Sequence, residues 1–358
     1  MSAASEPQPG AGFAYVGCFT TEKRRARGDG IHVYAVSAED GAWSDIQHVP
    51  DLVNPSFLVM GAGDRTLYAV HGDQDYASAY ARDTRTGRLQ PLGKAASGGD
   101  NVVHGALDSS GRHFVVANYG TGSVAVLPVA EDGGLADYAQ RLMMPGTPGP
   151  HRTEQSGSHP HHVVFDASGR FVLVPDKGHD SVCVFAFEAG RGTLELVSMT
   201  KSRPGAGPRH GAFHPTLPVY WVLNELDSSI TTYRWSAQAG SLEPVQLLPT
   251  LPSDFFGAST AAAIVVTPCG RYVFASNRGH DGVAAFAVDA KTGQLEPRGW
   301  TQAPGREPRF MTFHGNSLYV ASERDDVIGQ FAVDARDGRL RDQRRAVSSL
   351  SPVSIAFA

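Results

Sequence analysis

Residues 207–229 read GPRHGAFHPTLPVYWVLNELDSS and contain one complete pair of predicted strands. The two segments on either side of HPTLP have the composition of β-strands, and HPTLP itself has the prolines of a turn. The pattern therefore predicts two antiparallel strands. Charged residues nevertheless stand at the strand ends, with Arg209 at the start of the pair and Glu225 at its end.

The same unit recurs along the chain. When PRHGAF is taken as the anchor, similar starts occur at Pro55, Val102, Pro160, Pro208, Ala261, Pro308 and Pro352, in steps of 47, 58, 48, 53, 47 and 44 residues. Six of them are followed by a turn, an apolar strand, a second turn, a third strand and a more polar fourth strand. Four short strands in a repeat of about 40 to 50 residues are typical of a β-propeller blade.

The seventh start stops after one strand, at Ala358. Three further strands, FAYVGCF, GIHVYAV and WSDIQHV, precede the first anchor and supply the missing part. We therefore predict an all-β fold, a seven-bladed β-propeller of four-stranded antiparallel blades, whose N- and C-terminal strands share one blade. The propeller is expected over residues 13–358, after a flexible leader at 1–12. The alternative, seven independent hairpins in an open sheet, would leave exposed strand edges.

Equivalent positions of the blades form rings, because the first strand of every blade lines the central channel. The position after the anchor carries Ser56, Val103, His161, Arg209, Ala262, Arg309 and Val353. The far end of the second strand carries Gly72, Tyr119, Lys177, Glu225, Arg278 and Arg324. The start of one antiparallel strand lies beside the end of the next, so both rings are expected at the same mouth of the channel.

Charges on turns are often only solvated surface residues. Here, however, the pattern gathers one carboxylate, one imidazole and several guanidinium groups on one concave face, which suits an anionic ligand and proton transfer. A metal site is a second interpretation, because His159 and His161 are spaced to share one face of a strand near His104 and His210. No carboxylate or thiolate accompanies them in the alignment, so we expect neither a metal nor a cofactor.

Composition excludes several classes of protein. With 41% hydrophobic and 19% charged residues the chain has a globular composition, and no stretch approaches the roughly 20 apolar residues of a membrane span. The net charge of −5 gives no basic footprint for nucleic acid or an anionic membrane. Three widely spaced cysteines build neither a disulfide framework nor a zinc motif. We expect a cytoplasmic monomer that binds a small molecule.

Several motifs resemble the seven-bladed propeller lactonase family, which includes propeller-type 6-phosphogluconolactonases and fungal carboxy-muconate lactonising enzymes. They are HRTEQSGSHPHHVVFD, GAGPRHGAFHP, NELDSS, ANYGTGSV and SNRGHDGV, and the resemblance covers nearly the whole chain. It implies that His161, Arg209, Glu225 and Arg278 are the catalytic residues. These four also belong to the rings deduced from the repeat.

The resemblance implies a lactone hydrolase similar to 6-phosphogluconolactonase. Glu225 and His161 would act as base and acid, in either order, while Arg209 and Arg278 would clamp the anion and stabilise the oxyanion. Further contacts with a small anionic lactone are expected from His159, His210, Lys177, Arg309, Tyr119 and Arg324. The alternatives are a muconate-type cycloisomerase and a non-enzymatic propeller that binds small anions or proteins.

Overall fold

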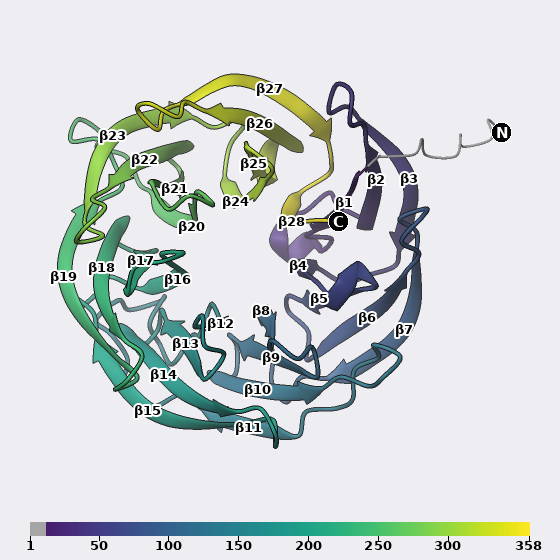
Figure 1. The fold of residues 1–358 in the computed structure, drawn as a ribbon, viewed down its shortest axis with the longest axis horizontal. Coiled ribbons are helices and arrows are strands. Elements are labelled where there is room, and N and C mark those ends of the chain that lie inside the picture. Colours follow the sequence, from purple (N-terminus) through teal and green to yellow (C-terminus); the bar gives the residue numbers. More distant parts are fainter. Residues whose placement is uncertain (1–11) are drawn as a thin grey trace.

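The chain folds into seven sheets arranged in a ring around a central channel (Figure 1). The computed structural model describes residues 12–358, apart from the side chains of residues 342, 343 and 345. The predicted leader lies outside this range except for its last residue. Every sheet has four strands, and all the paired strands are antiparallel. The predicted seven-bladed β-propeller is thus confirmed.

The blades are numbered along the chain. Blade 1 contains β4 (Pro55–Met60), β5 (Thr66–His71), β6 (Tyr76–Arg82) and β7 (Leu89–Ala96). Blade 2 contains β8 (Val102–Leu107), β9 (His113–Asn118), β10 (Ser123–Pro128) and β11 (Gln140–Met143). Blade 3 contains β12 (Val164–Phe165), β13 (Phe171–Asp176), β14 (Ser181–Glu188) and β15 (Thr193–Lys201).

The next three blades repeat this arrangement. Blade 4 contains β16 (Pro208–Phe213), β17 (Val219–Asn224), β18 (Ser229–Ser236) and β19 (Ser241–Pro249). Blade 5 contains β20 (Thr260–Val266), β21 (Tyr272–Arg278), β22 (Gly282–Val288) and β23 (Leu295–Gln302). Blade 6 contains β24 (Pro308–His314), β25 (Ser317–Ser322), β26 (Val327–Val333) and β27 (Leu340–Ser348).

Blade 7 closes the ring with strands from both ends of the described chain. Its order is β28 (Pro352–Phe357), β1 (Gly12–Cys18), β2 (Gly30–Val36) and β3 (Trp43–Pro50). Val16 of β1 pairs with Ile355 of β28, and the two strands lie side by side at the channel (Figure 1). The predicted closure is confirmed, and it pairs an edge of β1 that would otherwise be open.

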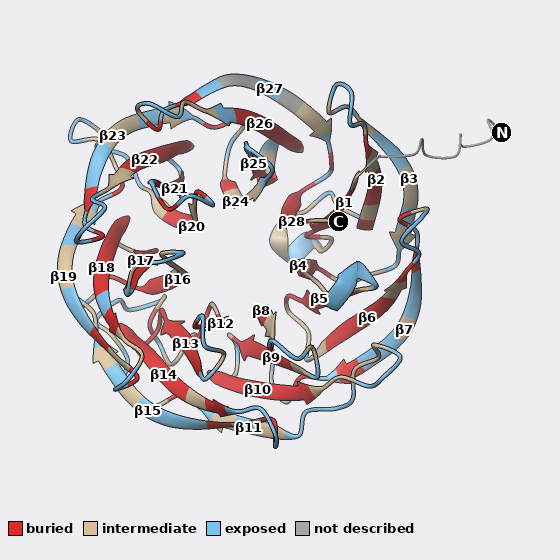
Figure 2. Ribbon diagram, in the orientation of Figure 1, coloured by how far each residue is buried: buried red, intermediate tan, exposed pale blue. Residues whose placement is uncertain are grey.

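The core lies between the blades. Each of seven apolar clusters joins two neighbouring blades, as where Trp221 of blade 4 packs in one cluster with Val273 and Phe286 of blade 5. Burial decreases outwards, and exposed residues alternate with half-buried ones along the outer strands β3, β19 and β23, in pale blue and tan in Figure 2. A blade buries its faces only against its neighbours, so the packing of the ring fixes where each inner strand ends.

Blade 3 departs from the predicted pattern at HPHH, residues 159–162. This stretch is not a regular strand; β12 is confined to Val164–Phe165, and Pro160 forms only an isolated bridge with Asp176. Pro175 on the facing strand has no N–H to donate, which removes one ladder hydrogen bond. The carboxylate of Asp176 instead accepts the backbone N–H of His159 at 2.7 Å.

Helical structure in residues 12–358 is restricted to short 3-10 turns. These are η1 (Glu22–Arg24), η2 (Ala62–Asp64) and η3 (Glu323–Asp325). Within the same residues, no helix has the length and apolar character needed to cross a membrane.

Candidate active site

A cavity of about 510 Å³ opens at one mouth of the channel. Every residue of the two predicted rings lines it except Ala262, whose carbonyl accepts a hydrogen bond from Arg209. Its cationic side chains are Lys23, Arg24, Arg25, Lys177, Arg209, Arg278, Arg309 and Arg324, and its carboxylates are Glu154, Glu225, Glu307 and Glu323. The protein is acidic overall, so this positive excess is a local feature of the cavity.

β-Bulges explain why the residue after each anchor reaches the cavity. In blade 4, Pro208 pairs with Asn224 and His210 with Leu223, so Arg209 is an extra residue in the inner strand. The inner strands of blades 1, 2, 5, 6 and 7 shift register at the corresponding place. A bulge leaves its extra residue outside the ladder and re-aims its side chain. The predicted ring is therefore a ring of bulges, interrupted only in blade 3.

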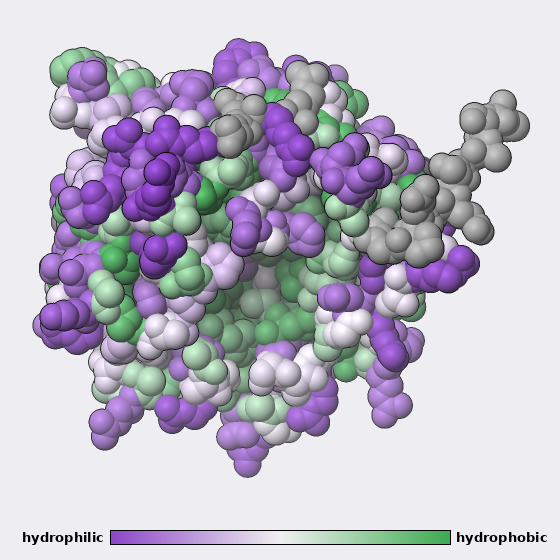
Figure 3. All heavy atoms as spheres, turned by 45° about the horizontal axis from the view of Figure 1, so that its top comes forward, coloured by the Kyte–Doolittle hydropathy of each residue, from purple (hydrophilic) through white to green (hydrophobic). Residues whose placement is uncertain are grey.

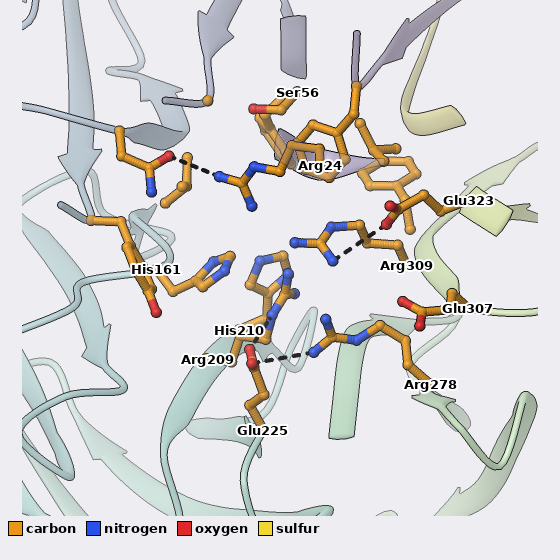
Figure 4. A pocket seen from close by; sticks show the side chains of 18 of the residues that line it. Arg24, Ser56, His161, Arg209, His210, Glu225, Arg278, Glu307, Arg309 and Glu323 are labelled. Atoms are coloured by element: carbon orange, nitrogen blue, oxygen red, sulfur yellow. Dashed lines mark hydrogen bonds and ion pairs between the residues drawn. The ribbon is translucent and has the colours of Figure 1, made fainter. Parts of the chain in front are cut away.

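Glu225 is the centre of the charged cluster (Figure 4). Its Oε2 lies 2.8 Å from Nε of Arg209, and its Oε1 lies 3.1 Å from Nζ of Lys177 and 3.3 Å from Nη2 of Arg278. Lys177 also bonds Glu154 at 2.6 Å. Residues at the ends of strands in blades 3, 4 and 5 thus place three cations in contact with one carboxylate.

This surrounding charge controls the ionisation of the cluster. Burial disfavours the charged form of Glu225, but Arg278, Lys177 and Arg209 outweigh it and hold the pKa of Glu225 well below its ordinary value. Burial likewise disfavours the charge on Lys177, yet Glu225, Tyr119 and Glu154 raise the pKa of that ammonium. Glu225 is therefore a carboxylate, and it is too well stabilised to be a strong base.

His161 lies beside this cluster with its ring facing the cavity (Figure 4). Its ring centroid is 5.5 Å from that of Tyr119, in an edge-on contact, and 5.2 Å from that of His210. Burial lowers the pKa of His161 well below its ordinary value; Arg209 adds to this effect, and Glu225 opposes it. His161 is thus a neutral imidazole, and its Nδ1 has no hydrogen-bond partner among the described residues.

The remaining predicted contacts divide into two groups. His210, Lys177, Arg309, Tyr119 and Arg324 line the cavity, whereas His159 does not. The His159 ring stacks on Tyr119 with 4.4 Å between centroids, and its Nδ1 lies 3.0 Å from the Tyr119 carbonyl oxygen. His159 therefore supports Tyr119, which lines the cavity, without lining the cavity itself.

Phe19 and the loop that follows it, which includes η1, form a wall that the repeat alignment missed. Phe19, Lys23, Arg24 and Arg25 all line the cavity. The loop lies between β1 and β2, outside every anchor, so alignment of the blades could not place it. One signal was available, because Lys23–Arg27 has four basic residues in five positions.

The histidines in the channel do not form the metal site considered from the sequence. His104, His162 and His210 pack ring against ring below His161, with centroids 4.0 to 5.8 Å apart. Among the described residues, the one group of three or more potential ligands with donor atoms close enough together is Asp29, His32 and His48 on blade 7. None of these three lines the cavity.

The other mouth of the channel has a different chemistry. A second cavity of about 690 Å³ opens there, and its wall is mostly apolar, with Met60, Phe165 and Phe313 among its residues. Figure 3 shows this face, with apolar side chains in the central hollow and hydrophilic ones around it. Among the described residues, no Lys, Arg, Asp or Glu lines this second cavity.

Comparison with known proteins adds independent information. The family described as "Lactonase, 7-bladed beta-propeller" matches residues 13–357. The 6-phosphogluconolactonase of Bacillus subtilis is 29% identical over 96% of this chain and 98% of its own, and that of Pectobacterium carotovorum is 31% identical over 75% and 80%. The periplasmic gluconolactonase of Pseudomonas aeruginosa superposes with a TM-score of 0.89 at 30% identity, over 97% of this chain and 99% of its own.

Proposed function

Because the chain belongs to the seven-bladed β-propeller lactonase family, we propose that it hydrolyses an anionic sugar lactone, 6-phosphogluconolactone, in the cavity that contains Glu225. The resemblance inferred from its motifs is confirmed by the match over residues 13–357. Relatives named 6-phosphogluconolactonase and gluconolactonase support hydrolysis of a cyclic sugar ester.

One observation carries the proposal. A neutral imidazole, His161, lies beside a carboxylate that three cations hold, in a cavity with more positive than negative side chains. Such a site attracts an anion, offers a lone pair to water and supplies cations for a developing negative charge. These are the three requirements of ester hydrolysis on an anionic substrate.

His161 is the proposed general base. It accepts a proton from a water molecule as the water oxygen forms a bond to the lactone carbonyl carbon. The tetrahedral intermediate then breaks its bond to the ring oxygen, and the protonated His161 returns the proton to that oxygen. The product is an open-chain hydroxy acid, which ionises. Glu225 is a weaker candidate for base, because Arg209, Lys177 and Arg278 already contact its two carboxylate oxygens.

Arg278 and Arg209 are proposed to stabilise the oxyanion. The guanidinium of Arg278 faces the cavity in Figure 4, and Glu225 and the carbonyl oxygen of Ala261 hold it at 3.3 and 3.1 Å. Arg209 is held by Glu225 and by the carbonyl of Ala262. Fixed donors of this kind contribute roughly 2 to 4 kcal/mol each to the stability of a transition state. Glu225 thus acts as a positioning residue, and no step requires a metal.

The test is acid release from freshly prepared 6-phosphoglucono-δ-lactone, with the EDTA-treated protein and after subtraction of the spontaneous rate. Glucono-δ-lactone is assayed in the same way, and a carboxy-muconate is followed by proton uptake, because closure of its carboxylate onto a double bond consumes a proton. Turnover of a sugar lactone supports the proposal. Turnover of the carboxy-muconate alone would replace it with the cycloisomerase alternative, and turnover of none of the three would contradict enzymatic action on these classes.

A further inference from the structure

We propose that the wall formed by Phe19, Arg24, Arg25 and Arg309 is a phosphate subsite, through which the protein selects phosphorylated over neutral sugar lactones. This inference rests on the proposed lactonase function and adds residues that the family resemblance does not assign, because Phe19, Arg24 and Arg25 lie outside the two rings of equivalent positions. All four residues line the cavity that also contains Glu225, and Figure 4 shows Arg24 and Arg309 pointing into it.

The wall carries positive charge that the protein does not neutralise. The cavity is lined by eight cationic side chains and four carboxylates. Three of the cations already bond Glu225 on the catalytic side. Around Phe19, Arg309 has only a 3.5 Å contact with Glu323, and the guanidinium of Arg25 has no hydrogen-bond or ion-pair partner among the described residues. Lys23 and Arg24 share the single carboxylate of Asp73. A dianionic group placed there would complete the charge balance.

The geometry of the wall is preorganised for such a group. The guanidinium carbon atoms of Arg24 and Arg309 lie 4.8 and 4.9 Å from the centroid of the same Phe19 ring. Asp73 holds Arg24 through two contacts, at 2.7 and 3.0 Å, and Asn101 adds a third at 3.3 Å. Two planar guanidinium groups thus pack on the same aromatic ring, and guanidinium groups match the oxygens of a phosphate.

The cavity is also large enough for one substrate that contacts both the Glu225 cluster and the wall. A cavity of about 510 Å³ lies within the range of roughly 300 to 1,000 Å³ that holds small-molecule ligands. His161 and Glu225 come from blades 3 and 4, whereas Arg309 comes from blade 6 and Phe19 from the end of blade 7. A sugar phosphate can therefore place its lactone on one side and its phosphoryl group on the other.

The experiment measures kcat/KM on 6-phosphoglucono-δ-lactone and on glucono-δ-lactone for wild type, Arg24→Gln and Arg25→Gln. We expect the ratio of the two values to fall about 10- to 100-fold in Arg24→Gln, since a charged hydrogen bond to the phosphate is lost. Arg27→Gln is the matched control, because Arg27 belongs to the same loop but pairs with Asp326 and does not line the cavity. Its ratio should stay within twofold of the wild-type ratio.

The outcomes separate the two proposals. Equal losses on both lactones, or an unchanged ratio in both Arg24→Gln and Arg25→Gln, would overturn the subsite while leaving the lactonase intact. If neither lactone is turned over, the subsite is tested by the binding of inorganic phosphate. Phosphate should raise the Tm of the wild type and raise the Tm of the two variants much less. Arg25→Gln keeps the test decisive if Arg24→Gln fails to fold. The Arg25 side chain supports no other contact in the described structure, so its loss should not disturb the fold.

Discussion

Oε2 of Glu225 lies 2.8 Å from Nε of Arg209, and the two side chains are only 10% and 3% exposed. An ion pair so far from solvent is costly to form and more costly to break, because the surviving charge stays buried. Lys177 and Arg278 depend on the same carboxylate. Glu225 therefore contributes to the free energy of unfolding and also sets the positions of the three cations around it.

The first prediction concerns this carboxylate. Glu225→Gln should lower the free energy of unfolding by about 3 kcal/mol, since three buried cations lose their counter-charge. Urea unfolding measures the change. Glu243→Gln is the control, because Glu243 pairs with Arg234 at the surface, where both side chains are about two-thirds exposed, and it should cost less than about 1 kcal/mol. Equal losses in the two variants would contradict the assigned role of Glu225.

The second prediction concerns Arg278. Arg278→Gln should lower kcat on the lactone by about 10²- to 10³-fold, the effect of removing one oxyanion donor. Steady-state acid release measures it, and circular dichroism checks the fold. Arg298→Gln removes a cation from the outer surface, where Arg298 pairs with Glu296, and should leave kcat within twofold. An Arg278 variant with wild-type kcat would remove this residue from the mechanism.

The third prediction follows from the buried imidazoles. Burial lowers the pKa of His162 to about 3, and it also lowers the pKa values of His104, His161 and His210. The unfolded chain takes up protons on these groups near pH 6.5, whereas the folded chain does not, so stability falls as pH falls below about 6.5. The lowered pKa of Glu225 acts in a separate window, because its stabilisation is lost only below its ordinary value of 4.5.

Urea unfolding at pH 7.5 and pH 5 tests the predicted direction of this pH dependence. His162→Gln should reduce the loss of stability between these two values by about 2 kcal/mol, because one imidazole no longer takes up a proton on unfolding. Leu247→Ala, which changes no titratable group at an exposed position of the outer strand β19, is the control and should leave the pH dependence unchanged. A wild type that is equally stable at both pH values would show that the imidazoles are protonated in the folded state.

The fourth prediction concerns closure of the ring. Ile355 of β28 is 3% exposed and packs between blades 6 and 7, so Ile355→Ala should cost about 2 to 4 kcal/mol of unfolding free energy. Leu247→Ala, at an exposed position of the outer strand β19, should cost under about 0.5 kcal/mol. A loss at Ile355 no larger than that at Leu247 would contradict the closure by β28.

The repeat made most of the fold and much of the site predictable. Anchors at equal positions place residues in rings, so His161, Arg209, Glu225 and Arg278 could be assigned to one mouth without coordinates. The bulge that turns Arg209 into the cavity was not visible in the sequence, because a bulge changes the pairing register and leaves the composition of the strand unaltered.

Other features depended on tertiary contacts that no repeat encodes. Phe19 and Arg24 lie between β1 and β2 of blade 7, in a segment that alignment of the blades does not place, and only the closed ring brings them to the cavity. His159 was expected to contact the substrate, yet the irregular backbone of blade 3 stacks it behind Tyr119. The contacts that separate the roles of His161 and Glu225 also required the structure, because only the fold shows that three cations contact the Glu225 oxygens.

The most direct test of the account is the rate of acid release from 6-phosphoglucono-δ-lactone by His161→Asn, compared with wild type at pH 7. The account predicts that the variant stays folded and loses activity by about 10²- to 10⁴-fold, as expected when a general base is removed. A folded His161→Asn variant whose kcat/KM lies within about threefold of the wild-type value would contradict the central claim that this neutral imidazole activates the attacking water.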